Sequence, residues 1–196
     1  MDGRESPSGN PTLGAGRFLL ARPVLDGTPF EKSVVLLMQY GKDEGAMGFV
    51  VNRVVPMPIN EILVGAEREP GRRRPVSIGG PVEPSSVRIL EFRRVEDGSA
   101  PESAAGAEVR SAEDLVRELE NPFAYIFMGY SGWSPRQLER EIADGCWEIW
   151  SADPAVVLSD RDRLKGITPE QFKASYAPAV VRTVEEDEAP GSGDGL

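Results

Sequence analysis

Short hydrophobic runs rich in β-branched and aromatic residues recur along the chain, bounded by turn-forming residues. Runs of this length and composition are typical of strands. The predicted strands are Arg17–Ala21, Ser33–Tyr40, Ala46–Asn52, Pro75–Ile78, Val87–Phe92 and Ala124–Tyr130. A regular alternation of strands with helices is missing, which favours an α+β fold. We expect a mixed, β-rich and partly barrel-like central sheet flanked by about four helices.

Helical periodicity and cap residues predict helices between and after these strands. They are Ile59–Ala66, Ser111–Glu120, a helix that starts at Ser134, and Thr168 to about Tyr176. The last two begin alike, because Ser134 or Thr168 as N-cap is followed by proline and, three residues after the cap, by glutamine. That order is a capping box. Gly145 is placed to end the Ser134 helix.

The ends of the chain differ from its interior in composition. Residues 1–13 are rich in glycine, serine and proline, and residues 185–196 are acidic and poor in apolar side chains. Both compositions are typical of disorder. The chain has 196 residues, of which 40% are hydrophobic, so residues 14–184 are long enough to form one domain with a core.

Composition narrows the chemistry that the chain can perform. No histidine occurs, which excludes Ser-His-Asp and Cys-His catalysis and imidazole metal ligation. Cys146 is the single cysteine, so a disulfide within the chain and a C-x-x-C site are excluded, and without a basic neighbour its thiol has no activator. We identify no catalytic residue and expect neither a metal ion nor a cofactor.

Hydropathy and charge set expectations for location and partners. The run Val34–Met38 is far shorter than the roughly 20 apolar residues that span a bilayer, and the N-terminus lacks a signal-type pattern. We expect a cytoplasmic protein that does not enter the membrane. The net charge of −10 argues against direct nucleic-acid binding, and Arg72–Arg74 form the only dense basic cluster.

Polar and glycine-rich residues gather where predicted strands end. The residues concerned are Asn52, Arg53, Gly79, Gly80, Tyr130, Ser131 and Trp133. An amide beside a guanidinium can hold a carboxylate or phosphate, and a glycine pair can expose backbone N–H groups. The same residues can instead satisfy backbone carbonyls and form a tight turn. We take them as a candidate cleft for a small anionic ligand or a protein partner, with the Ser131 hydroxyl free to contact it.

Five separated blocks also resemble the YqgE/AlgH family, in that family's order. They read "GRFLLARP", "FEKSVVLLMQY", "GAMGFVVNR", "IGGPV" and "FMGYSGWSPRQLEREIADGCW". The resemblance covers roughly residues 16–158 and implies a mixed α/β fold with a β-rich centre and a role in transcriptional regulation. The chain departs from the family pattern at Gln39 and Glu91, where relatives often carry His, and at Val54, where Pro is usual.

Three functions of different classes remain. A non-enzymatic regulatory or binding domain fits the polar strand ends and the lack of an activated nucleophile best. An enzyme that uses carboxylates and arginine, with or without Mg²⁺, is compatible with the absence of histidine, but no D-x-D or E-x-x-E block lies near those strand ends. A transcriptional regulator acting through DNA or a DNA-bound partner follows from the resemblance, and the charge argues against direct contact with DNA.

Overall fold

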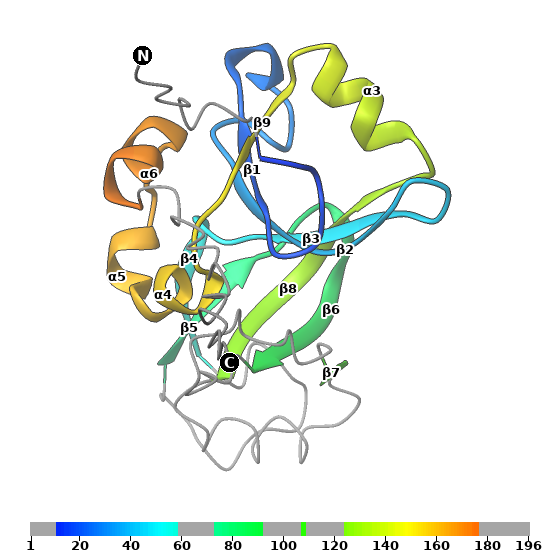
Figure 1. The fold of residues 1–196 in the computed structure, drawn as a ribbon. Coiled ribbons are helices and arrows are strands. Elements are labelled where there is room, and N and C mark those ends of the chain that lie inside the picture. Colours follow the sequence, from blue (N-terminus) through cyan, green and yellow to red (C-terminus); the bar gives the residue numbers. More distant parts are fainter. Residues whose placement is uncertain (1–10, 59–72, 92–106, 109–123, 177–196) are drawn as a thin grey trace, which may run out of the picture.

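The computed structural model describes residues 11–58, 73–91, 107–108 and 124–176. Its centre is a nine-stranded sheet in which the main path runs β4-β5-β8-β3-β2-β1-β9, while β6 pairs with both β7 and β8. The strands are β1 (Phe18–Ala21), β2 (Val34–Gly41), β3 (Gly45–Val50), β4 (Val54–Pro58), β5 (Arg73–Ile78), β6 (Val82–Glu91), β7 (Ala107–Glu108), β8 (Ala124–Trp133) and β9 (Trp147–Trp150). The sheet curls into a half-barrel (Figure 1).

Helices flank this sheet on two sides. They are α3 (Gln137–Ala143), α4 (Pro154–Ser159), α5 (Arg161–Leu164) and α6 (Pro169–Ser175), with a 3₁₀ turn, η1, at Pro23–Leu25. In Figure 1, α4, α5 and α6 gather on one side, and α3 lies apart from them beyond the ends of β2 and β3. No described helix is long and apolar enough to cross a membrane.

The side chains of β1 and β2 point alternately to the two faces of the sheet, and each face carries a hydrophobic core. Phe18 and Leu36 face the cluster that Phe172 of α6 completes, whereas Leu19 and Leu37 face the cluster that contains Leu138 of α3. Successive side chains of a strand point to opposite faces, so β1 and the buried part of β2, Val34–Leu37, need apolar residues at every position to fill both clusters. This requirement explains the uninterrupted hydrophobic runs in the sequence.

The structure confirms the predicted fold class and corrects its details. β5 runs parallel to β8 while the other strand pairs are antiparallel, so the described sheet is mixed. The predicted helices Ile59–Ala66 and Ser111–Glu120 lie outside the described residues, as do both predicted disordered ends for most of their length. The sequence analysis missed β4, β7, α4, α5 and the 3₁₀ turn η1, whereas the aromatic residues that follow Cys146 indicate the strand β9. β4 contains Pro56 and Pro58, which are residues that argue against a strand.

The two predicted capping boxes have different outcomes. Thr168 caps α6 as expected, since its hydroxyl accepts from Gln171 N and the Gln171 side chain accepts from Thr168 N. Ser134 is not the N-cap of α3, because the helix begins at Gln137 after Arg136, which takes a left-handed conformation with φ 60°. The other half of the predicted box is present, since Gln137 Oε1 accepts from Ser134 N at 3.0 Å. Arg136 N donates to Lys42 O in the β2–β3 turn, and because of this tertiary contact the helix begins at Gln137 and not directly after Ser134.

The predicted end of the Ser134 helix is confirmed. Gly145 has φ 77° and its N–H donates to Ile142 O, while Cys146 N donates to Glu141 O. These two bonds form a Schellman motif, in which a glycine in the left-handed region satisfies the last carbonyls of a helix. The chain then turns directly into β9.

Four strands converge on a buried set of small residues, which we call the glycine junction: Gly48, Gly79, Gly80, Gly129 and Ser131. The end of β5 is inserted between β3 and β8, because Gly79 N donates to Met128 O at 2.7 Å and Gly79 O accepts from Val50 N at 2.8 Å. A Cβ atom on Gly129, which has φ 66°, would lie 2.6 Å from Gly80 O. Backbone approaches of this kind leave no space for side chains.

We expect Gly80→Ala to destabilise the protein by roughly 3 kcal/mol, because its methyl group would overlap the backbone of Tyr130 and lie 2.5 Å from Ser131 Oγ. Gly14→Ala is the matched control, since no atom lies within 4 Å of the added methyl group. Urea denaturation measures both free energies of unfolding. Equal stability of the two variants would show that the junction is loosely packed.

Candidate functional site

Asn52, the first of the sequence-predicted site residues, ties three segments together. Its side chain is 5% exposed. Its Oδ1 accepts from Val34 N at 2.9 Å, and its Nδ2 donates to Lys32 O and Ile167 O, both at 2.8 Å. A buried amide whose hydrogen bonds go to backbone groups positions those segments rather than offering itself to a ligand.

Arg53 lies beside Asn52 and is half-buried. Its Nη2 donates to Glu31 O at 3.0 Å and to Ser33 Oγ at 2.9 Å. Burial lowers the pKa of the guanidinium, and the Glu31 carboxylate opposes that shift. Because one edge of the guanidinium is engaged with the β1–β2 connection, Arg53 holds that connection against the end of β3.

Gly79, Gly80 and Ser131 belong to the glycine junction and not to an open corner. Ser131 lies within β8, opposite Gly48 of β3, and is fully buried. Its hydroxyl donates to Gly79 O at 3.0 Å. The expectation that this hydroxyl is free to contact a ligand is therefore corrected: local sequence placed "GYSG" between a strand and a helix, whereas sheet pairing extends β8 to Trp133.

Tyr130 and Trp133 are held by other side chains. The Arg88 guanidinium lies over the Tyr130 ring, 4.8 Å from its centroid, and also pairs with Glu83. The indole N–H of Trp133 donates to Glu141 Oε2 at 2.9 Å, and the same oxygen accepts from Trp147 Nε1 at 2.8 Å. A carboxylate shared by two indoles fixes the orientation of both rings.

The seven predicted residues do not form one cleft. Trp133 pairs with Ala46 near the start of β3, and Asn52 follows its end. At about 3.3 Å per residue these positions are roughly 20 Å apart. Asn52 and Arg53 lie beside the segment that carries Gly79 and Gly80, because Ile78 N donates to Arg53 O at 3.0 Å, whereas Trp133 lies near a different surface feature.

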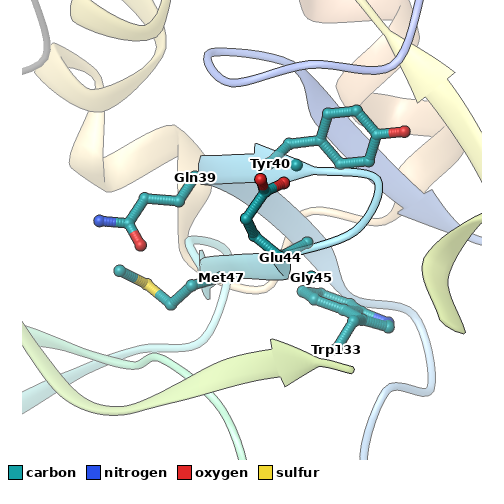
Figure 2. Close-up of a pocket in the computed structure, with 8 residues that line it drawn as sticks. Gln39, Tyr40, Glu44, Gly45, Met47 and Trp133 are labelled. Carbon is teal, nitrogen blue, oxygen red and sulfur yellow. The ribbon is translucent and has the colours of Figure 1, made fainter. Parts of the chain in front are cut away.

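That feature is an open hollow at the β2–β3 turn, which we call the hairpin hollow. Its volume is about 330 Å³, and it is lined by Gln39, Tyr40, Gly41, Glu44, Gly45, Ala46, Met47 and Trp133. Gln39 and Met47 are cross-strand partners, and Figure 2 shows their side chains projecting from the hairpin in the same direction. The sequence analysis does not predict this hollow, although two of its lining residues stand out in the sequence: Gln39 departs from the family pattern, and Trp133 belongs to the candidate cleft.

The walls of the hairpin hollow are rigidly held. Tyr40 donates its hydroxyl proton to Glu139 Oε1 at 2.8 Å, and burial together with this carboxylate raises the pKa of the phenol. The turn is fixed to the start of α3, since Arg136 Nη2 lies 2.8 Å from Asp43 Oδ1. Gln39 and Glu44 are exposed. The hollow thus combines fixed aromatic walls with an accessible amide and carboxylate.

The described residues offer little for covalent or metal chemistry. They contain no group of three or more histidine, cysteine, aspartate or glutamate side chains placed to hold a metal ion. Desolvation, and then the carboxylates of Glu141 and Asp144, raise the pKa of the Cys146 thiol, which disfavours the nucleophilic thiolate.

Comparison with known proteins identifies the family. A family model described as AlgH-like matches residues 18–167. The protein belongs to the AlgH-like family. A UPF0301 protein of Ruegeria pomeroyi is 34% identical over 75% of this chain and 84% of its own length. A UPF0301 protein of Anaeromyxobacter is 36% identical, with 72% of this chain and 78% of the relative covered.

Solved structures agree with this assignment to the AlgH-like family. The solution structure of the AlgH protein from Pseudomonas aeruginosa matches with a TM-score of 0.56 and 26% identity, over 88% of this chain and 89% of that one. A crystal structure from Corynebacterium diphtheriae shares the fold, with a TM-score of 0.52 and 19% identity over 72% and 77%. The names of these two proteins state no ligand or reaction, and the second match, at 19% identity, supports the fold alone.

In this AlgH-like chain, alanine substitutions at Ser131 and Ser134 should change the free energy of unfolding by different amounts. Ser131→Ala should lower the free energy of unfolding by about 1 kcal/mol, because a buried hydrogen bond to Gly79 O is lost. Ser134 is exposed and does not cap α3, so Ser134→Ala should change stability by less than about 0.5 kcal/mol. Chemical denaturation compares them, and a larger loss at Ser134 would restore the capping interpretation.

Proposed function

We propose that this protein is a non-enzymatic binding domain that recognises a partner through the hairpin hollow. The observation that carries the proposal is the contrast between two kinds of polar side chain. Asn52 and Ser131 are buried and bonded to backbone groups, whereas Gln39 and Glu44 are exposed beside fixed walls. Preorganised walls reduce the conformational entropy that is lost on binding, and accessible polar groups fix the orientation of the bound partner.

The composition of the chain supports binding rather than catalysis. The sequence contains no histidine, and its single thiol has a raised pKa. The hydroxyl of Ser131 donates to a carbonyl and has no base beside it within the described residues. Nucleophilic catalysis needs an activated group, and none of these side chains is activated.

The lining of the hollow favours a cationic group. Glu44 is its one carboxylate, and no basic side chain lines it within the described part of the chain. The neighbouring Asp43 is neutralised by Arg136, so Glu44 contributes the accessible charge. A lysine or arginine side chain of a protein, or a small-molecule amine, would place its charge on Glu44 and its methylene groups against Met47.

Spermidine is a suitable probe for this proposal. We expect it to raise the unfolding midpoint of the protein with a saturable dependence, because a ligand at one hundred times its dissociation constant adds about 2.7 kcal/mol. Glu44→Gln should remove most of this stabilisation. A thermal unfolding titration at constant ionic strength measures the effect.

The control addresses the net charge of the whole chain. A protein with a net charge of −10 attracts any cation weakly, and this attraction must be distinguished from binding at Glu44. The control variant is Asp26→Asn, which removes one exposed carboxylate away from the hollow. Spermidine should stabilise this variant as it does the wild type. An equal loss in Glu44→Gln and Asp26→Asn would mean diffuse attraction and would contradict the proposal.

A further inference from the structure

A second hollow lies between α5 and α6, on the side of the sheet away from α3. Its volume is about 480 Å³, and it is lined by Arg163, Lys165, Gly166, Ile167, Gln171 and Ser175. This volume falls within the range of small-molecule sites. We call it the basic hollow, because two of its lining residues are cationic and none in the described part of the chain is acidic.

The floor of the basic hollow is fixed by Asn52. Gly166 N donates to Asn52 O at 2.9 Å, and Asn52 Nδ2 donates to Ile167 O at 2.8 Å. The capping box of Thr168 and Gln171 then sets the direction of α6. The segment between α5 and α6 is thus held at both ends, which keeps its lining groups in place before any ligand arrives.

The side chains around this floor present mainly donors. Arg163 Nε pairs with Asp160 Oδ2 at 3.0 Å, and its two terminal nitrogens have no hydrogen bond to another described residue. Lys165 is exposed and has no ion-pair partner among the described residues. Gln171 uses its Oε1 to accept from Thr168 N, so its remaining amide group can only donate.

We infer that the basic hollow binds the phosphate or carboxylate group of a small-molecule ligand, with Lys165 and Arg163 as the charged contacts. This site is separate from the hairpin hollow and has the opposite charge preference. The lining supplies donors, and the carboxylate paired with it, that of Asp160, engages Arg163 through Nε, so an oxyanion can accept several bonds at once from the other donors. The inference also gives Asn52 a role in a binding site, as the residue that positions its floor.

Inorganic phosphate tests this site without knowledge of the full ligand. In the full-length protein, the amide resonances of Gly166 and Ile167 should shift saturably on titration with phosphate, and sodium chloride at equal ionic strength should not reproduce the shifts. Replacing both cations, as Arg163→Gln with Lys165→Gln, should weaken binding by roughly tenfold or more. Sodium acetate tests a carboxylate in the same way.

Matched variants separate this site from general attraction to positive charge. Lys42→Gln removes an exposed lysine from the β2–β3 turn and should leave phosphate affinity unchanged. Lys165→Arg keeps the charge and should retain binding. Absence of saturable shifts in the wild type, or equal affinity in the double variant, would overturn the inference, whatever the outcome of the spermidine experiment.

Discussion

The close approach of β3, β5, β6 and β8 at the glycine junction is the constraint on which the rest of the structure depends. β5 and β3 both end beside Gly79, whose N–H and carbonyl join β8 to β3. Without a side chain at Gly80 or Gly129, backbone groups that would otherwise be separated can lie in contact. The junction therefore turns strands from distant parts of the sequence into one curled sheet with a core on each face.

This constraint also explains where function can lie. Polar groups brought into the junction are far from water, so they must be satisfied by the protein itself, as Ser131 is by Gly79 O. Accessible polar side chains remain at the periphery, where turns and short helices leave hollows. One of these presents Glu44 and the other Lys165, which suits them to ligands of opposite charge. The same buried frame supports both.

The sequence predicted features that depend on local interactions. The capping box at Thr168 involves residues within one turn of helix, and the strands β1 and β2 follow from continuous apolar runs. Prediction failed where distant segments decide the outcome. Arg136 is drawn to the β2–β3 turn, so Ser134 does not cap α3, and pairing with Gly48 buries Ser131 in a strand. The hairpin hollow depends on the pairing that places Trp133 of β8 beside Ala46 in the β2–β3 hairpin, which no local pattern indicates.

Hydrogen exchange at the amides of Val50 and Gly79 tests most directly whether the glycine junction is a structural frame. Both amides donate within the junction, so they should exchange only through global unfolding, with an opening free energy equal to the free energy of unfolding. Exchange through local opening, at a free energy several kcal/mol lower, would contradict the account. It would show instead that the polar strand ends open to solvent, as a ligand cleft at this position requires.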